Sequence, residues 1–373
     1  MASSLTDRLS AAAKAAGDAG VDALLITPGA DLRYLVGYHA LPLERLTCLL
    51  VPATGEPVLI VPLLEQPAAE ASGAADQVRV VTHGETDNAY ALAVGLLRDA
   101  LGGQPTAIGV ADRMWAEQVL TFRDTLPGTR ITTAGSVLRP LRLRKDPDEI
   151  EGLRRAGQAI DRVHARMGEW LRPGRTERAV GRDIAEAIVA EGHASVNFTI
   201  VASGPNGASP HHDLSDRVIE AGEPVVVDIG GTMPDGYCSD CTRTYLAAGT
   251  PPAEFSAYFS VLHDAQVASC QSVRPGVAAE SVDAAARDII TQAGYGEFFM
   301  HRTGHGIGLE EHEEPWIVAG NETLLAPGMA FSIEPGIYRR GHHGARIEDI
   351  VTVTDNGVER LDTITRRLVV LDA

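Results

Sequence analysis

The sequence predicts a protein of two domains, an α/β domain followed by a larger α+β domain. At 373 residues the chain is long enough for both. Before residue 145, short apolar runs alternate with a helical pattern, whereas beyond it longer helical patterns are followed by pairs of apolar strands. The basic segment 138–147 between them is punctuated by proline. We therefore place the boundary near Lys145, with domains 1–145 and 146–373.

The first domain is expected to begin with a helix and to continue through strands. Residues 1–20 are rich in alanine with charged side chains at intervals, a pattern that favours an amphipathic helix over a secretory signal. The segment Cys48–Pro62 holds two apolar runs around Thr54-Gly55, which predicts a hairpin. Further along we expect strands at 78–83 and 107–112 with a helix at 89–101 between them.

The second domain is expected to contain four long helices, with strand pairs between and after them. The first helix has acidic residues in its first turn, as helix N-termini favour. The expected helices are 147–171, 177–191, 252–273 and 281–293.

Composition excludes several classes of protein. The net charge of −18 repels nucleic acid, and 45% hydrophobic with 22% charged residues is ordinary for a globular protein that does not enter a membrane. Four cysteines are too few for a disulfide scaffold in a chain of this length, which suits a reducing cytoplasm. We expect a cytoplasmic protein without nucleic-acid or membrane partners.

Two hairpins place carboxylates inside apolar strands. In VVVDIGGTMPDGYCSDCTRTY, Asp228 and Asp240 stand 12 residues apart across one turn. In AFSIEPGIYRRGHHGARIEDIVTV, Glu334 and Glu348 stand 14 apart in the same design. Burying such acids is costly unless a cation compensates their charge. The pattern therefore favours a metal site.

A histidine-rich segment supplies a further kind of ligand. HRTGHGIGLEEHEEP contains His301, His305 and His312, and its glycines argue against the helical zinc motif. Four hard oxygen donors with one imidazole favour two ions such as Mn, Co, Fe or Zn over Ca or Mg alone.

Other residues near these motifs have simpler interpretations. We interpret Asp349 as an ion-paired or exposed charge, because strand parity turns it away from its neighbour at 348. Cys238 and Cys241 form a single C-x-x-C pair, so we expect packed thiols rather than a zinc knuckle. His342 and His343 lie in a turn, where we expect them to face solvent.

The motifs in this order resemble the metallopeptidases of the prolidase and aminopeptidase P group, which have the pita-bread fold. The matching residues are the Asp of VVVDIGG, the Asp of SDCTRT, the second His of HRTGHGIG, the Glu of SIEPGIY and the first Glu of RIEDI. The resemblance covers the whole second domain, and the first domain resembles the creatinase-type N-terminal domain. Bacterial Xaa-Pro dipeptidases, especially those of actinobacteria, are the most similar in length and in the residues of these motifs.

The resemblance implies a dinuclear site with two divalent metal ions, Mn being the usual activator and Co, Zn or Fe the alternatives. It implies that Asp240 and Glu348 bridge both ions. The turn between the first two acids is one residue longer than is usual in the family, which should alter the loop without moving either ligand. The implied metal ligands are Asp228, Asp240, His305, Glu334 and Glu348.

The resemblance also implies residues that contact substrate or support the ligands. His211 and His312 correspond to substrate-binding histidines, and His301 to a histidine of the active site that binds no metal. Arg346 is expected to fix the carboxylate of Glu348, two residues further along the strand.

The implied activity is hydrolysis of Xaa-Pro bonds in short proline-containing peptides, most of all dipeptides, by a homodimer. A hydroxide shared by the two ions would attack the carbonyl, His211 or His312 would stabilise the oxyanion, and Glu334 would carry the proton to the leaving nitrogen.

Several alternatives stay open. Aminopeptidase P acts on longer peptides and needs an open channel where a dipeptidase binds a free carboxylate. Arg339, Arg340 and Trp316 are candidates to shape that subsite, or surface residues. A creatinase-like small-molecule hydrolase or a non-catalytic peptide-binding module would be expected to lack ligands that are present here. The extra N-terminal domain and the surroundings of His312 disfavour methionine aminopeptidase.

Overall fold

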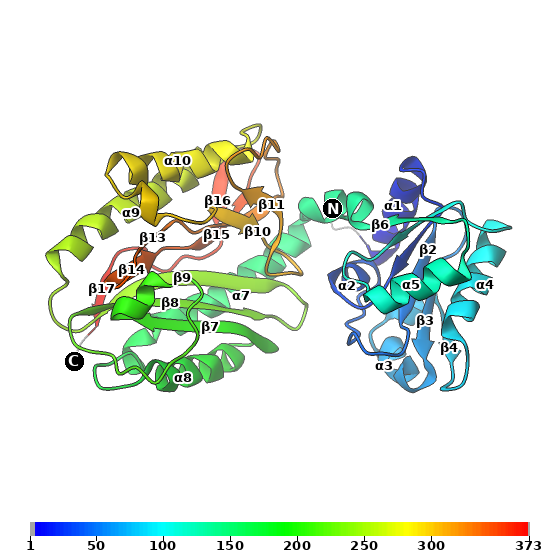
Figure 1. Ribbon diagram of the computed structural model, residues 1–373, viewed down its shortest axis with the longest axis horizontal. Coiled ribbons are helices and arrows are strands. Elements are labelled where there is room, and N and C mark those ends of the chain that lie inside the picture. Colours follow the sequence, from blue (N-terminus) through cyan, green and yellow to red (C-terminus); the bar gives the residue numbers. More distant parts are fainter. Residues whose placement is uncertain (1–3, 372–373) are drawn as a thin grey trace. The chain divides into compact units, whose positions relative to one another are not determined.

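The computed structural model describes residues 4–371, and its chain divides into two compact units, Met1–Arg142 and Leu143–Ala373 (Figure 1). Lys145, where the sequence predicts a boundary, lies just inside the second unit. Its ammonium group pairs at 2.5 Å with Oε1 of Glu313, and both side chains are nearly buried. The basic stretch that resembles a linker is therefore already part of the second unit at Lys145.

The first unit is an α/β fold around a six-stranded mixed sheet of order β4-β3-β2-β1-β5-β6. The predicted hairpin is confirmed, because β2 and β3 pair in antiparallel register. The strands are β1 (Ala23–Ile26), β2 (Cys48–Pro52), β3 (Val58–Pro62), β4 (Arg79–His83), β5 (Ala107–Val110) and β6 (Arg130–Thr133). The α-helices are α1 (Leu5–Asp18), α2 (Ala30–Val36), α3 (Gln66–Ala71), α4 (Ala89–Leu101), α5 (Ala116–Thr125) and α6 (Gly135–Leu143).

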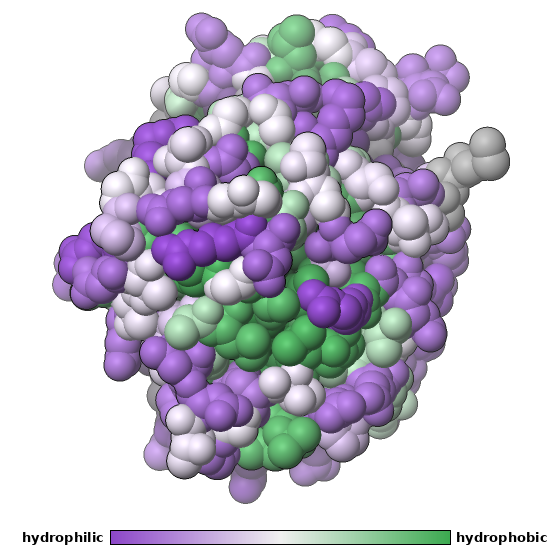
Figure 2. Space-filling view, turned by 90° about the vertical axis from the view of Figure 1, so that its right-hand side faces the viewer, coloured by the Kyte–Doolittle hydropathy of each residue, from purple (hydrophilic) through white to green (hydrophobic). Residues whose placement is uncertain are grey.

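Local signals explain where the helices of this unit begin. Helix α1 starts with a capping box, in which the Ser4 hydroxyl accepts from the backbone N–H of Asp7 while the Asp7 carboxylate accepts from the N–H of Ser4. Helix α4 starts with Asn88, whose side chain accepts from the N–H of Ala91 at 2.9 Å. Figure 2 shows hydrophobic side chains gathered amid hydrophilic ones on the side of this unit where α4 and β4 lie.

The second unit confirms the predicted α+β class. Helices α7 (Pro147–Ala165) and α8 (Glu177–Ala190) precede a sheet of order β17-β9-β8-β7, and α9 (Ala253–Ser272) and α10 (Ala279–Gln292) precede a sheet of order β11-β10-β12-β15-β16. In Figure 1 the strands lie between α9 and α10 above and α7 and α8 below. The strands are β7 (Ser195–Ser203), β8 (Glu223–Thr232), β9 (Cys238–Ala247), β10 (Gly304–Gly306), β11 (Glu313–Ile317), β12 (Ala330–Ile333), β13 (Gly336–Arg339), β14 (His343–Arg346), β15 (Asp349–Val353), β16 (Val358–Arg360) and β17 (Val369–Leu371).

Strands β8 and β9 form the first carboxylate hairpin. Asp228 lies opposite Thr242, and Asp240 lies opposite Gly230. Because alternate residues of a strand share a face and opposite residues point the same way, Asp228, Asp240 and Thr242 all project from one side of the hairpin. The two strands pair as far as the turn at residues 233–237. The residue by which this turn is longer than is usual in the resembled family therefore lies outside the paired region.

The second pair of acids, Glu334 and Glu348, lies at the junction between two antiparallel strand pairs. Strand β12 pairs with β15, and β13 pairs with β14. Glu334 directly follows β12, and Glu348 directly precedes β15. Because Glu348 lies outside both strand pairs, its backbone N–H can donate to the carbonyl of Thr242 on β9, at 3.1 Å. This hydrogen bond joins the two carboxylate hairpins.

The two glycines beside His305 allow β10 to fit between its neighbours. A Cβ atom at Gly304 would lie 1.8 Å from the carbonyl oxygen of Ser332, and one at Gly306 would lie 2.1 Å from that of Glu314. No side chain fits at these distances. Only glycine therefore fits on either side of His305, and the Gly-His-Gly sequence lets β10 carry His305 into the interior.

Two details differ from the sequence predictions. The helix predicted over 147–171 ends at Ala165, after which Met167–Glu169 forms a separate 3₁₀ turn. His343 was predicted to face solvent with His342, but it is buried. It packs against Tyr258, whose hydroxyl lies 2.6 Å from Nδ1 of His343. The exposed position of His342 is as predicted.

Within residues 4–371, no helix combines the length and the apolar character that crossing a bilayer would require.

Candidate metal centre

A cleft of about 1120 Å³ in the second unit brings most of the predicted site residues together. The two hairpins supply four of its acids. The loop after β7 and the segment around β10 supply its histidines, together with Asp213 and Glu311. The predicted site residues that line it are His211, Asp228, Asp240, His301, His305, His312, Glu334, Arg346 and Glu348.

The carboxylates form overlapping groups with ligand atoms close enough to share ions. Asp228, Asp240 and Glu348 each have an oxygen within 4.8 Å of the others, and a second group of this size joins Glu348 to His305 and Glu334. Asp228, Asp240 and Glu348 are 6%, 3% and 2% exposed. Such burial of several acids within a few ångströms requires compensation by protons or by cations.

The pKa values of these acids show how strongly burial disfavours their negative charges. Burial, with repulsion from the neighbouring acids, raises the pKa of Asp240 and of Glu348 well above the usual values. Burial also raises the pKa of Glu334 to about 7. Oδ1 of Asp240 and Oε1 of Glu348 are buried without a hydrogen-bond partner among the described residues. Divalent metal ions fit this set of donors, because they would supply both the missing partners and the missing charge.

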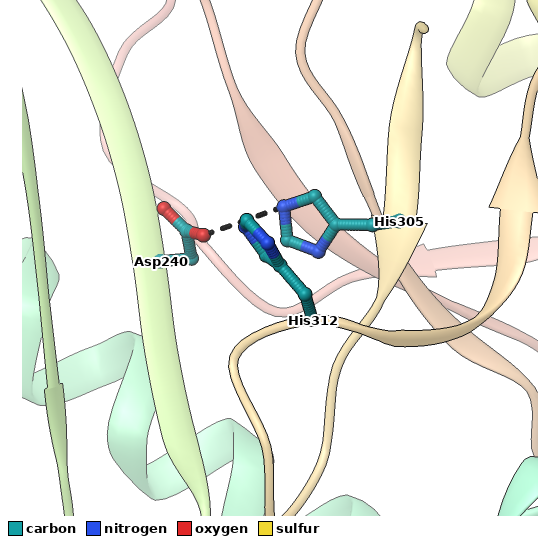
Figure 3. Close-up of side chains that lie close together, drawn as sticks. All are labelled: Asp240, His305 and His312. Atoms are coloured by element: carbon teal, nitrogen blue, oxygen red, sulfur yellow. Dashed lines mark ion pairs between the residues drawn. The ribbon is translucent and has the colours of Figure 1, made fainter. Parts of the chain in front are cut away.

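His305 has the protonation state that a metal ligand needs. Its Nδ1 donates to the carbonyl of Gly306 at 3.1 Å, which leaves the lone pair of Nε2 facing Oδ2 of Asp240 at 3.6 Å and Oε1 of Glu334 at 3.4 Å. Burial lowers its pKa to about 3. The ring of His312 lies 3.9 Å from that of His305, centroid to centroid. Figure 3 shows Asp240, His305 and His312 converging from two strands and a loop.

Arg346 is held differently from the way the sequence predicts. Its guanidinium forms a buried ion pair with Asp228 rather than with Glu348. Its Nε donates to Oγ1 of Thr242 at 3.0 Å, and that hydroxyl lies 2.7 Å from Oε2 of Glu348. Arg346 is thus linked to Glu348 by hydrogen bonds through Thr242, and its charge also opposes the rise in the pKa of Glu348. Sequence reasoning missed Thr242, although its position two residues after Asp240 places it on the ligand face.

His301 ends a hydrogen-bonded chain that begins at Arg346. Nη1 of Arg346 donates to the hydroxyl of Tyr338 at 3.0 Å, and that hydroxyl donates to Nε2 of His301 at 2.9 Å. Nδ1 of His301 donates to the carbonyl of Arg302 at 2.7 Å. Burial lowers the pKa of His301 to about 4, so both ring nitrogens are engaged in a neutral imidazole. Tyr338 was not singled out from the sequence.

A buried glutamate holds the loop that carries His211. His211 is exposed at the cleft, and the next residue, His212, places Nε2 2.8 Å from Oε2 of Glu177. Glu177 is fully buried at the start of α8 and also accepts from the hydroxyls of Ser203 and Ser215. Sequence reasoning gave His212 and Glu177 no role, and only their proximity in space connects them.

The candidates for a carboxylate subsite are dispersed. Arg339 forms an ion pair with Glu254, and Arg340 is exposed. Neither is among the residues that line the cleft. Trp316 lies on β11 beneath the guanidinium of Arg302, which does line it.

The interpretations of Asp349 as ion-paired and of Cys238 and Cys241 as packed thiols are confirmed. Asp349 is fully buried and forms ion pairs with Arg243 at 2.6 Å and Arg360 at 2.8 Å. These guanidinium groups overcome the effect of burial and lower its pKa. Cys238 and Cys241 are free, buried thiols.

A cleft in which buried carboxylates and a neutral histidine converge is typical of metal-dependent hydrolases. The chain belongs to the metallopeptidase family M24, whose model matches residues 151–355, and residues 8–144 match the creatinase/prolidase N-terminal domain. It is therefore a peptidase of a family that works with divalent metal ions.

Named relatives resemble the chain over nearly its whole length. The probable dipeptidase PepE of Mycobacterium tuberculosis is 53% identical over 365 residues, covering 98% of this chain and 96% of that protein. The Xaa-Pro dipeptidase of Lactobacillus helveticus is 36% identical over 343 residues, or 91% and 92% of the two chains. The crystal structure of a prolidase from Thermococcus sibiricus superposes with a TM-score of 0.92 at 37% identity, covering 99% of both chains. The predicted pita-bread fold is confirmed.

Proposed function

We propose that this chain is a dinuclear-metal peptidase that hydrolyses the Xaa-Pro bond, with dipeptides as its main substrates. The observation that carries the proposal is the pair of buried, unpartnered oxygens on Asp240 and Glu348 beside the neutral Nε2 of His305. The names of the relatives, Xaa-Pro dipeptidase and prolidase, support the substrate class.

The overlap of the ligand groups supports two positions with shared ligands. Glu348 belongs both to the group with Asp228 and Asp240 and to the group with His305 and Glu334. Asp240 in turn also lies near His305. We assign Asp240 and Glu348 as bridging ligands, Asp228 to one ion, and His305 with Glu334 to the other.

Two ions bound there would activate a water molecule and polarise the scissile carbonyl. Glu334 lines the cleft beside these ions, where its carboxylate can accept a proton from the attacking water and deliver it to the proline nitrogen. His211 and His312 stand at the open side of the cleft, where they can donate to the carbonyl oxygen as it gains charge. An Xaa-Pro bond has no N–H, and none of these roles requires one.

The identity of the metal and the setting of the enzyme are further parts of the proposal. Carboxylate-rich sites suit Mn, and an imidazole also suits Zn, Fe or Co, so Mn is the first ion to test. A homodimer in the cytoplasm stays a prediction from the resemblance.

The proposal is tested by stripping the protein of metal, restoring Mn²⁺, and comparing hydrolysis of Ala-Pro, Ala-Pro-Ala and Ala-Ala. We expect metal-dependent cleavage of Ala-Pro above all, and none by the Asp240→Ala variant. Preferential cleavage of Ala-Pro-Ala would assign the chain as an aminopeptidase P. If metal restored cleavage of none of the three peptides, the proposal would be overturned.

A further inference from the structure

Three buried side chains that the proposed mechanism does not use converge on the far side of β9 from the cleft. Asp161 on α7, Cys241 on β9 and Asp362, just beyond β16, each offer an atom within 4.8 Å of the others. Cys241 directly follows Asp240 in the strand, so the two side chains point to opposite faces. None of the three residues lines the cleft. The group is therefore separate from the proposed catalytic site.

Two carboxylate oxygens of this group have no partner. Oδ2 of Asp161 accepts from the N–H and the hydroxyl of Thr363, at 2.5 and 2.7 Å, and Oδ2 of Asp362 accepts from the N–H of Ile350 at 2.5 Å. The Oδ1 atom of each acid is buried without a hydrogen-bond partner among the described residues. Asp161 is 8% exposed, and Asp362 is fully buried. Two such oxygens side by side require a proton or a cation.

A glycine of α7 leaves room beside this pair. A Cβ atom at Gly157 would lie 3.1 Å from Oδ1 of Asp362 and 3.1 Å from the carbonyl oxygen of Leu361. Gly157 and Asp161 are four residues apart, so they lie on the same face of the helix. The unpartnered oxygen of Asp362 therefore faces the side of α7 that carries Asp161.

The arginines near this pair are committed to another acid. Asp349 forms ion pairs with Arg243 at 2.6 Å and with Arg360 at 2.8 Å. The other hydrogen bonds of Arg243 go to backbone carbonyl groups. Burial, with repulsion from Asp349 and Asp161, raises the pKa of Asp362 well above its usual value although Arg243 opposes the rise. The negative charge of the pair is thus left to be balanced by something else.

We propose that Asp161, Cys241 and Asp362 bind a further divalent ion of the type of Zn²⁺ or Co²⁺, which ties together α7, β9 and the segment after β16. A thiolate beside carboxylates favours these ions, whereas Mn²⁺ prefers oxygen donors and is expected to fill only the cleft. Binding releases the proton of the thiol to water. Sγ of Cys241 lies 3.6 Å from the carbonyl oxygen of Glu348, so the ion would support the backbone of both proposed bridging ligands from behind.

This inference goes beyond the proposed function, because the ion would bind whether or not the cleft hydrolyses peptides. Co²⁺ is a suitable probe, since a thiolate ligand gives it a charge-transfer absorption in the near ultraviolet that oxygen and nitrogen ligands do not give. The proposed ligands of the cleft include no sulfur, so this absorption reports on the new site alone. The protein is produced with Co²⁺ present, so that the buried site can fill as the chain folds.

We expect the dialysed Co²⁺ protein to show the thiolate absorption and to hold one ion more than the cleft binds. Cys241→Ser and Asp362→Asn should each lose the absorption together with that one ion, as counted by elemental analysis. Cys238→Ser is the matched control, because Cys238 is another free, buried thiol of β9 that belongs to none of the ligand groups. It should keep both the absorption and the ion.

The outcomes separate this inference from the proposed function. A wild-type protein without the thiolate absorption would overturn the inference and assign the two carboxyl groups to a shared proton. An absorption that persists in Cys241→Ser, or an ion count that persists in Asp362→Asn, would also overturn it. The absorption together with a failure to hydrolyse Ala-Pro would support the inference and overturn the proposed function alone. Serine and asparagine closely match the shapes they replace, and thermal unfolding verifies that each variant is folded.

Discussion

The hydroxyl oxygen of Thr242 lies 2.7 Å from Oε2 of Glu348, although the two residues are 106 positions apart in the sequence. Thr242 belongs to the first carboxylate hairpin and Glu348 to the second. The same hydroxyl lies 2.7 Å from Oδ1 of Asp228. One buried hydroxyl therefore lies in hydrogen-bonding contact with two proposed metal ligands that come from different hairpins.

Replacing Thr242 with valine should weaken metal binding. Valine keeps the shape but removes the hydroxyl, so Asp228 and Glu348 each lose an orienting contact. Losses of this kind typically lower metal affinity by about 10- to 100-fold. Calorimetric titration of metal-free Thr242→Val with Mn²⁺ measures the change.

Thr244→Val is the matched control, because Thr244 lies on the same strand and the same face. Its hydroxyl donates to the carbonyl of Arg346 at 2.9 Å and accepts from its N–H at 3.2 Å, so it contacts backbone only. We expect it to lose about 1 kcal/mol of unfolding free energy with unchanged metal affinity. Equal losses of affinity in both variants would contradict the orienting role of Thr242.

Arg346→Met should destabilise the metal-free protein by about 3–5 kcal/mol, because it leaves the buried charge of Asp228 without its partner. Adding Asp228→Asn to this variant is expected to restore part of the loss, since the unpaired charge is then gone. Urea unfolding of the single variants and of the double variant gives the coupling energy. A coupling near zero would show that the ion pair is not what stabilises this part of the cleft.

The metal-free protein should lose unfolding free energy as the pH rises above about 6.5. Burial raises the pKa of Glu334 from 4.5 to about 7, so the folded state keeps a proton that the unfolded chain has released between these values. Burial lowers the pKa of His301 and His305 from 6.5 to about 4 and about 3, which opposes the effect of the acids at lower pH. Above about 6.5 the imidazoles of the unfolded chain lose their remaining protons, so their opposing effect fades and that of the acids prevails.

Urea unfolding at about pH 6.5 and about pH 8 tests this pH dependence. Glu334→Gln should show a smaller decline, because it removes one of the acids concerned. Saturating Mn²⁺ should abolish the decline, since metal binding requires deprotonated ligands and strengthens as the pH rises. A metal-free protein whose stability increases over this interval would contradict the assigned pKa directions.

The sequence predicts the ligand-bearing hairpins because each is a local pattern. An apolar run, a turn rich in glycine and a second apolar run specify β8 and β9 without reference to distant residues. The glycines at 304 and 306 predict a segment that is not helical, and the structure adds the reason, which is the close approach of Ser332 and Glu314.

Residues that act through distant partners could not be predicted in this way. Thr242, Tyr338 and Glu177 are ordinary polar residues in the sequence, and each gains its role from a neighbour more than 25 residues away or in another strand pair. The burial of His343 has the same cause, since its partner Tyr258 lies on a helix 85 positions earlier. Arg346 was assigned to its nearest acid along the strand, whereas packing between the hairpins gives it Asp228.

In the function proposed for this chain, these carboxylates and His305 hold two metal ions that the reaction requires. The most direct test is a calorimetric titration of metal-stripped protein with Mn²⁺, with Ala-Pro hydrolysis measured at each addition. We expect binding of two ions per chain and activity that rises until both sites are filled, with fewer ions bound by Asp240→Asn. Full activity without added metal, or at most one ion bound per chain, would contradict the proposed function.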